Sequence, residues 1–469
     1  MTFQSVPINF VGQSYQHRSR SLSSQVTMNL IPEFVPSGKT QTALTAWPGS
    51  KSFSAGSGKD RGMHVFAGTL FKVSGNTLES IAANGTRTSF GTIDGSNPCI
   101  FADDGYTMRI ATGNKDYQVK DGVLSVIVDP DLNPGNSVAY INQQMINDSN
   151  GGQFQVSDVG VPGSISANNF ATAESSPDDT IRAFTFNERL YLFGDGNSTE
   201  TWWNSGSGNP PFDRVQGGTM NIGISSPYSA ASSTDFVYFL GSDNSVYRFS
   251  ATQPELITPT AISAIFQSYT TTTDARAYVV NIEGMSFYVI NFPTAGKTWA
   301  YNEDGKAWFQ LSTGADQDNY TGTSYAEAYG KKYIGSGGNI LELDIDTFTD
   351  NGETIIRERV TPPIVSPNGN RIEMSSLTLL METGTGLITG QGVDPKVMIQ
   401  ASYDGGKSWG DEDWVDIGRL GAGRVKVEWY NMASAYEILI RVRVSDPVFV
   451  SINKVKLDIS IRLPLRLQL

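Results

Sequence analysis

The stretch "RAFTFNERLYLFGDG", residues 182–196, decides how this chain folds. On both sides of Asn187 and Glu188, polar residues alternate with Phe, Leu and Tyr. Alternation with a period of two is typical of a β-strand that buries one face. Two such runs joined by a short polar turn and closed by Gly-Asp-Gly predict a β-hairpin.

Five further stretches have the same texture: "MHVFAGTLFKVSG" from residue 63, "CIFADDGYTMRIATG" from 99, "FVYFLGSDNSVYRFS" from 236, "RAYVVNIEGMSFYVINF" from 276 and "YAEAYGKKYIGSGGNILELD" from 325. The hairpins recur at irregular intervals that average about fifty residues, and a period of 40–50 residues with several strands in each unit is typical of propeller blades. Because no strict repeat is present, a set of unrelated β-sandwiches stays open as the alternative.

We therefore expect an all-β protein with an N-terminal arm, a β-propeller-like domain and a C-terminal antiparallel β-sandwich-like domain, at residues 1–50, 51–349 and 350–469. The C-terminal boundary is placed where longer alternating strands begin, among them "EMSSLTLLMETG" and "YEILIRVRV". Residues 129–180 are rich in Gly, Asn, Ser and Pro, which predicts an insertion in one blade connection that could hold a partner or be a surface excursion.

One short helix is predicted near residues 259–268, where apolar side chains fall on a single helical face after a Thr-Pro start. The arm is polar and irregular, but it also carries Tyr15, Leu22, Leu30 and Phe34. Because a free tail would leave these side chains in water, we expect the arm to cross to a neighbouring subunit or to pack on the C-terminal domain.

The composition excludes several function classes. With 34 basic against 47 acidic residues the net charge is −13, which argues against tight binding to a nucleic-acid backbone. Cys99 is the only cysteine, so the chain has no intrachain disulfide and no cysteine-based metal site. We expect no signal peptide, because the N-terminus has no basic region followed by an apolar one, and no membrane insertion, because no stretch approaches 18 apolar residues.

The stretch "SYDGGKSWGD", residues 402–411, matches the aspartate box, Ser-x-Asp-x-Gly-x-x-Trp, through Ser402, Asp404, Gly406 and Trp409. The motif recurs in sialidases and related propeller glycosidases, so a glycosidase-like tail enzyme acting on host glycans is the alternative function. The turn also has a local explanation, because Asp404 can cap backbone N–H groups of its own loop and Trp409 can fold under the loop as an apolar plug. We predict that the four residues form a structural turn.

No catalytic, metal or cofactor site is predicted from the remaining motifs, and we expect the protein not to be an enzyme. Its two histidines, His17 and His64, lie outside any nucleophile-elbow or metal-pair pattern. The paired carboxylates Asp103/Asp104 and Asp411/Glu412/Asp413 could in principle serve glycoside hydrolysis, but Asp is also common in turns.

Several stretches together resemble one family, the tail hub or nozzle proteins of short-tailed bacteriophages, also called packaged-DNA stabilisation proteins. These stretches are "VPINFVGQSYQHRSRSLSSQVTMNLIPE" (6–33), "RGMHVFAGTLFKVSGNTL" (61–78), "ISAIFQSYTTTTDARAYVVNIEGMSFYVINFPTAGKTWAYNEDGKAW" (262–308), "GVDPKVMIQASYDGGKSWGDE" (392–412) and "RVRVSDPVFVSI" (441–452). The chain departs from the family at Gly284-Met285, where Gly-His is common, and at Trp308-Phe309-Gln310-Leu311, where Trp-His-Glu-Arg is common. This loss of histidines also argues against a catalytic histidine.

The resemblance implies a homo-oligomer, a hexameric ring in the virion tail that is assembled in the host cytoplasm and extends the channel of the portal and adaptor rings. It also implies that tail needle, spike or fibre proteins attach to the ring and that the ring helps to retain packaged DNA until ejection. Six copies of net charge −13 would carry −78. We therefore expect DNA to pass through the channel without specific binding.

Overall fold

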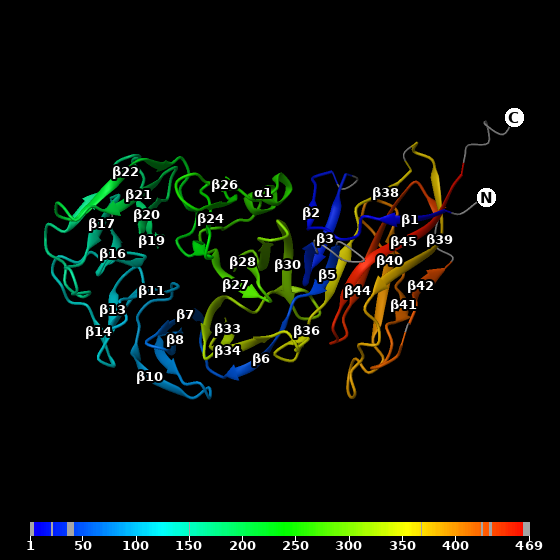
Figure 1. Ribbon diagram of the computed structural model, residues 1–469, viewed down its shortest axis with the longest axis horizontal. Coiled ribbons are helices and arrows are strands. Elements are labelled where there is room, and N and C mark those ends of the chain that lie inside the picture. The colour runs from blue at the N-terminus through cyan, green and yellow to red at the C-terminus, as the bar shows by residue number, and fades with distance from the viewer. Residues whose placement is uncertain are drawn as a thin grey trace.

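The computed structural model describes residues 4–19, 22–34, 42–149, 151–366, 368–423, 425–430 and 434–462. A ring of β-sheets makes up one end of the molecule and two packed sheets make up the other (Figure 1). The chain begins and ends its described course in the packed sheets, because β1 (Gln4–Ile8) pairs with β45 (Ser451–Arg462).

Seven sheets of the described residues are arranged as propeller blades (Figure 1). Apart from β19 and β23, the first strands of successive blades contact one another, which places these strands at the axis. The first three blades are β7 (Asp60–Phe66), β8 (Thr69–Ser74), β9 (Thr77–Ile81) and β10 (Arg87–Thr92); β11 (Ile100–Asp103), β12 (Thr107–Ala111), β13 (Asp116–Lys120) and β14 (Val123–Val126); β15 (Val138–Ile141), β16 (Gln144–Ser149), β17 (Gln153–Val156) and β18 (Phe170–Thr172).

The next three blades are β19 (Thr180–Phe186), β20 (Arg189–Gly194), β21 (Thr199–Asn204) and β22 (Phe212–Met220); β23 (Ala231–Ser232), β24 (Val237–Leu240), β25 (Val246–Phe249) and β26 (Glu255–Leu256); β27 (Arg276–Ile282), β28 (Met285–Phe292), β29 (Lys297–Asn302) and β30 (Ala307–Thr313). The seventh blade contains β32 (Ser324–Ala328), β33 (Lys331–Ser336) and β34 (Asn339–Asp344). The short β31 (Asp318–Asn319) pairs with β30.

Two-residue turns set the register of many of the hairpins. In the hairpin of β19 and β20, Asn187 (φ 48°) and Glu188 (φ 58°) are both left-handed, so that Phe186 lies opposite Arg189 and Phe184 opposite Tyr191. Positive φ at both positions is the type I′ geometry, whose twist matches that of the flanking strands. Glu283 (φ 50°) and Gly284 (φ 86°) form the same turn between β27 and β28.

The ring is closed by a strand from before the first blade. Strand β6 (Gly49–Ser54) pairs with β34 on one side, with Gly49 opposite Asp344, and with β35 (Thr349–Asp350) on the other. Strand β36 (Glu353–Thr354) completes this sheet. The expected boundaries at residues 50/51 and 349/350 therefore fall inside β6 and β35.

Residues 129–180 differ from the insertion that their composition suggests, because strands β15 to β18 form a complete four-stranded blade within them. The reason lies in the residues that this blade buries. Gln144, Asn147, Asp148, Ser149 and Gln155 are all buried, so its strands lack the apolar alternation by which a strand is recognised.

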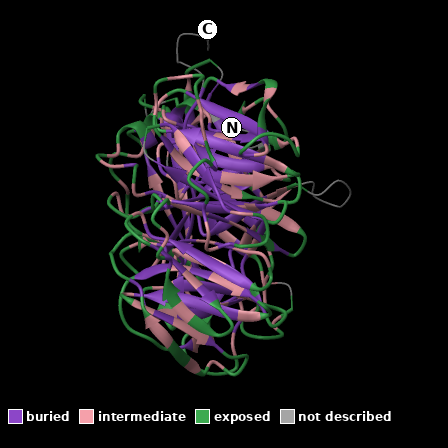
Figure 2. Cartoon of the chain, turned by 90° about the vertical axis from the view of Figure 1, so that its left-hand side faces the viewer, coloured by how far each residue is buried: buried purple, intermediate pink, exposed green. Residues whose placement is uncertain are grey.

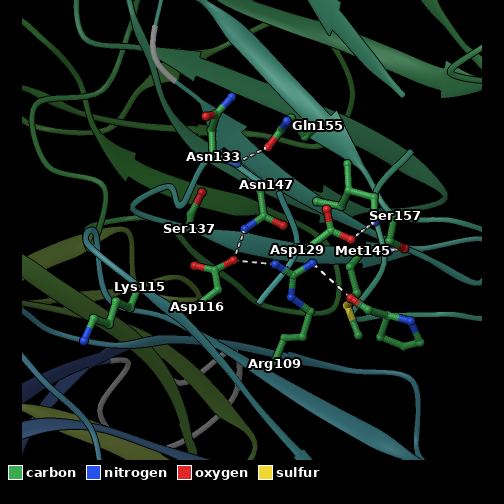
Figure 3. Close-up of polar contacts among 12 residues, drawn as sticks. Arg109, Lys115, Asp116, Asp129, Asn133, Ser137, Met145, Asn147, Gln155 and Ser157 are labelled. Carbon is green, nitrogen blue, oxygen red and sulfur yellow. Dashed lines mark hydrogen bonds and ion pairs between the residues drawn. The ribbon is translucent and has the colours of Figure 1, made fainter. Parts of the chain in front are cut away.

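These buried polar groups are paired with groups of the same and the preceding blade. In Figure 3, Arg109 of β12 and Asn147 of β16 both point to the carboxylate of Asp116 on β13, and both donate to its Oδ2. Arg109 also donates to the carbonyl oxygen of Pro162, at 3.1 Å. A buried ion pair is costly to desolvate unless its hydrogen bonds are also provided, as they are here between two blades.

The C-terminal domain is a sandwich of two sheets. One sheet contains β1, β4 (Leu30–Phe34), β5 (Thr42–Ala46), β39 (Arg371–Met381), β42 (Val427–Tyr430), β43 (Ser434–Ala435) and β45. The other contains β2 (Tyr15–Gln16), β3 (Ser24–Met28), β37 (Arg357–Val360), β38 (Ile364–Val365), β40 (Lys396–Ser402), β41 (Asp413–Asp416) and β44 (Glu437–Val444). Strands β1 to β5 of the N-terminal segment thus belong to the C-terminal domain, and Leu30 and Leu44 are part of its apolar core.

Strand β3 joins the two domains, because it pairs with β30 of the propeller on one side and with β37 of the sandwich on the other. Next to it, buried Asn29 (φ 54°) donates through Nδ2 to the carbonyl oxygens of Ser312 (3.0 Å) and Ile356 (2.8 Å) and accepts at Oδ1 from the Ser312 amide. One sheet therefore continues from a blade into the sandwich.

Apolar cores lie between neighbouring blades, as the buried strands and exposed loops of Figure 2 illustrate. The helix is confirmed as α1 (Thr260–Gln267), which begins after Pro259 and packs Ile262 and Phe266 against aromatic side chains of β28 to β30. No helix of the described residues is long and apolar enough to span a membrane. The predicted fold class, a β-propeller-like domain followed by a β-sandwich, is confirmed.

The closure point of the ring yields a prediction about pH. Asp350 is buried where β6, β30 and β35 meet, and it accepts from Ser50 Oγ (3.2 Å) and Thr313 Oγ1 (2.7 Å). Burial raises the pKa of Asp350 to about 6. The folded state then binds this proton more tightly than the unfolded state. The contribution of protonated Asp350 to the free energy of unfolding is therefore largest below the pKa of the unfolded state, and it is lost as pH rises through about 6.

We expect the wild type to lose about 2 kcal/mol of unfolding free energy more than the Asp350→Asn variant does when the pH is raised from 4.5 to 7.5. Urea unfolding of both proteins at the two pH values measures this difference, and the contributions of all other groups cancel. The exposed carboxylate of Asp316 supplies the control, since Asp316→Asn should show no such change. A difference between Asp350→Asn and the wild type that is the same at both pH values would contradict the prediction.

Candidate functional site

A cleft of about 980 Å³ lies where the N-terminal segment, the propeller and the sandwich meet. It is lined by β2 and β3, by α1 and β30 of the propeller, and by β37, β44 and the loop after β40 of the sandwich. All four residues of the aspartate box lie in or next to this loop, and Gly406 and Trp409 line the cleft. This cleft is the candidate site.

The aspartate-box turn is built from side-chain caps. Asp404 Oδ1 accepts from the backbone amides of Lys407 and Ser408, both at 2.9 Å, and from Ser402 Oγ at 2.8 Å. The Gly406 amide donates to Ser402 Oγ at 2.9 Å. The hydrogen bond from the Ser408 hydroxyl, with those from the loop amides, holds the pKa of Asp404 well below its ordinary value. The carboxylate therefore stays ionised, as a capping acceptor must.

Trp409 differs from the buried plug that was expected. It is half-buried, and the guanidinium of Arg441 lies 3.9 Å from the centre of its ring. Arg441 also donates through Nη1 to Gln400 Oε1 at 3.0 Å, and burial lowers its pKa. A cation stacked on an indole ring is a favourable contact, so Trp409 connects the loop to β44 from the side of the cleft.

The turn is also attached to the N-terminal segment. Ser24 Oγ of β3 donates to the carbonyl oxygen of Gly405 at 3.1 Å. Strand β3 is the strand that joins propeller and sandwich, so the loop packs at the junction of the two domains. That the four residues have a structural role stays a prediction.

The chemistry of the cleft centres on one buried carboxylate. Among the described residues that line it, Glu358 is the only acidic one, and Arg443 Nε lies 2.5 Å from its Oε2. Glycoside hydrolysis ordinarily requires two carboxyl groups that flank the scissile bond. The lining supplies one, and that one is already paired with an arginine.

Arg441, Arg443 and Glu358 were not singled out from the sequence. Arg441 and Arg443 alternate with Val442 and Val444 in "RVRV", whereas Glu358 lies between Arg357 and Arg359 in "IIRERV", on a strand that is buried along its whole length. Such a pattern signals charges that need partners on the next strand, here β37 and β44, which are hydrogen-bonded neighbours.

The two histidines lie apart. His17 lines the cleft, where its Nδ1 accepts from the Ser19 amide at 3.1 Å. His64 lies in the propeller, 2.6 Å from Asp103 Oδ2, and its hydrogen bond lowers the pKa of that carboxyl. No group of three His, Cys, Asp or Glu residues in the described part of the chain is arranged to hold a metal ion.

The capping geometry predicts where the loop will open first. In the Asp404→Ala variant the amides of Lys407 and Ser408 lose their acceptor, so we expect their hydrogen exchange to accelerate and the hydrolysis of sialosides or host polysaccharide to be unaffected. Exchange mass spectrometry of peptides that span residues 402–409 measures the first effect. Asp411→Ala, which removes an exposed carboxylate beside the same loop, is the control and should leave the exchange unchanged. Exchange that is equal in both variants, or a glycan turnover that Asp404→Ala abolishes, would contradict the structural role.

Comparison with known proteins identifies the fold of both domains. The family model described as "Bacteriophage P22 Gp10, beta-propeller" matches residues 4–348, and the one described as "Bacteriophage P22 Gp10, beta-sandwich" matches residues 357–460. No individual curated protein matches the sequence.

Solved structures are similar only at low identity. The WD40 propeller domain of Doa1 is 11% identical, with a TM-score of 0.42 over 64% of this chain and 96% of that chain. BBS1N in its complex with ARL6DN is 9% identical, with a TM-score of 0.40 over 63% and 93% of the two chains. BamB from Moraxella catarrhalis is 9% identical, with a TM-score of 0.39 over 73% and 96%. All three TM-scores are below one half.

The two family matches follow each other in the order of the two observed domains, and together they span nearly all of the described residues. The chain belongs to the bacteriophage P22 Gp10 family of phage tail hub, or nozzle, proteins.

Proposed function

We propose that this chain forms a homohexameric ring in the virion tail, which extends the channel of the portal and adaptor rings and helps to retain packaged DNA. In this proposal the ring carries needle, spike or fibre proteins and is assembled in the host cytoplasm. The observation that carries the proposal is the match of both domains, in order, to the two halves of the Gp10 family. The role is structural and needs no catalytic residues.

The way in which the domains are joined supports a structural role. Buried Arg359 of β37 donates through Nε to the carbonyl oxygen of Phe10 (2.6 Å), through Nη1 to Thr27 Oγ1 (2.7 Å) and through Nη2 to Gln25 Oε1 (2.8 Å). These bonds fix the N-terminal segment beside β3, which is itself paired with both domains. Subunits of a closed ring must hold one geometry at every interface, and a hydrogen-bonded junction keeps the two domains of a subunit in one arrangement.

The distribution of charge supports free passage of DNA. Among the described residues, the buried charged side chains are six cations and six anions: Arg61, Lys72, Arg109, Arg248, Arg357 and Arg359, and Asp60, Asp116, Asp148, Glu200, Asp350 and Glu358. These buried charges cancel, so the net charge of −13 is carried by the remaining side chains. Such a surface repels a phosphate backbone, and retention of DNA would then come from a plug or partner.

The glycosidase alternative has no comparable support. Its motif is a capped turn at the domain junction, and Glu358, the one acidic residue among the described lining of the cleft, is paired with Arg443.

Ring formation is open to direct measurement. We expect the purified chain to form closed six-fold rings in negative-stain images, with a matching mass in sedimentation. A truncation that removes residues 1–34 should fail to form them, because it deletes β1 to β4 and the acceptors of Arg359. The exposed-site variant Arg419→Gln serves as the control and should assemble normally. A full-length protein that stays monomeric at every concentration, or a truncated one that assembles like the wild type, would refute the proposal.

The ring should also fail to bind DNA. In a shift assay with duplex DNA at low salt, we expect no complex at micromolar protein, because binding by counterion release requires clustered Lys and Arg. A basic DNA-binding protein in the same buffer confirms that the assay detects binding. Tight binding with a steep dependence on salt would show that the channel wall holds the DNA itself.

A further inference from the structure

The propeller contains a second cavity, of about 220 Å³, which we name the axis pocket. It is lined by residues of β7, β11, β19, β27 and β32, which are the first strands of five blades, and by Tyr228. Because first strands line the axis, side chains from separate blades converge here.

The lining of the axis pocket is basic, although the chain as a whole is acidic. Three arginines, Arg61, Arg182 and Arg276, contribute to it, and the described lining includes no Asp or Glu. The guanidinium of Arg61 already donates to four carbonyl oxygens, among them those of Asn97 (2.7 Å) and Ile93 (2.9 Å). The acceptors are all carbonyl oxygens, and no carboxylate accepts from this guanidinium.

The other two arginines have donors without partners. Nε and Nη1 of Arg182 are inaccessible to solvent and make no hydrogen bond, and the same holds for Nε of Arg276, which uses Nη1 to donate to the carbonyl oxygen of Asp60 at 2.8 Å. The buried hydroxyl of Tyr278, which also lines the pocket, makes no hydrogen bond either. Nearly all buried donors in folded proteins are paired, so several unpaired ones around one cavity point to an ordered water or a bound ion there.

The carboxylates near the pocket are directed mainly to other partners. Asp274, two residues before Arg276, accepts from Thr294 through Oδ2, and its Oδ1 is buried without a hydrogen bond. Asp60 pairs with Lys72 and accepts from Thr323 Oγ1 at 2.7 Å. Asp103 pairs with His64. Asp148 accepts from the amides of Asn136 (3.0 Å) and Ser137 (2.6 Å). The charges of Asp148 and Asp60 still act on Arg182 and Arg276, but none of the described carboxylates provides an acceptor oxygen to the unpaired N–H groups, which leaves these donors to a ligand.

We propose that the axis pocket binds a small tetrahedral oxyanion, phosphate or sulfate, between Arg182 and Arg276. Guanidinium groups are planar donors that match the oxygens of such anions, and a pair of them from two different blades can donate to one anion at the same time. The anion neutralises guanidinium groups of β19 and β27 and so connects their two blades. This proposed site lies within a single chain and does not depend on the proposed hexamer or its DNA channel.

The test compares inorganic phosphate and sulfate with chloride at equal ionic strength, using the full-length protein. We expect either oxyanion, and not chloride, to raise Tm in a concentration-dependent way, as a ligand of the folded state does. Isothermal titration with phosphate should give an affinity that Arg182→Gln and Arg276→Gln each weaken about tenfold or more. The exposed arginine variant Arg419→Gln is the matched control and should bind as the wild type does.

Two further arms keep the outcome decisive. Arg276→Lys keeps the charge but loses the planar fork, so its affinity should lie between those of the wild type and Arg276→Gln. Duplex DNA at the same phosphate concentration should give no shift, which separates a free oxyanion from a backbone phosphate. The proposal fails if phosphate and sulfate act no differently from chloride on the wild type, if both Gln variants keep the full response, or if only the duplex raises Tm.

Discussion

The whole structure depends on strand β6 and its hydrogen bonds to β34. A propeller is stable only as a closed ring, because an open one leaves the edge of its first and last blades unpaired. Here the residues that close the ring lie some three hundred positions apart, with Ser50 beside Leu343. The same stretch of chain runs from β3, between the domains, into β4 and β5 of the sandwich. Closure of the propeller and assembly of the sandwich are therefore two results of one N-terminal path.

This path makes the propeller an insertion within the sandwich. Strands β1 to β5 come from one end of the chain and β37 to β45 from the other, and every blade lies between them in sequence. The sandwich core illustrates the dependence, since Phe10 and Leu30 pack with Val442 and Leu457. The sandwich cannot be completed until the last residues are available, whereas the blades are built from local hairpins. Arg359 then secures the early segment against the late one through donors that are all directed to residues 10–27.

Where the sequence was informative, the physical signal was local. Type I′ turns and alternating aromatic residues predicted the hairpins, and a Thr-Pro start with one apolar face predicted α1. The blade of β15 to β18 was not predicted, because Asn147, Asp148 and Gln155 are buried by partners that only the neighbouring blade and loop supply. In the candidate cleft, too, the local interactions could be predicted from the sequence and the long-range ones could not. The cap by Asp404 follows from its own loop, whereas the contact of Trp409 with Arg441 joins residues that only the sheet brings together.

The pairing of β1 with β45 has a mechanical consequence. The two strands are antiparallel, and Gln4 lies opposite Ile459, so the two ends of the described chain meet at the same end of the ladder. Tension applied between them would separate the strands one rung at a time, as in a zipper, instead of shearing all five rungs together. The blades, which lie between β5 and β37 in the chain, would carry none of that force until the sandwich had opened. A pull on the ends of this protein is thus borne first by its outermost strand, and the propeller is mechanically shielded.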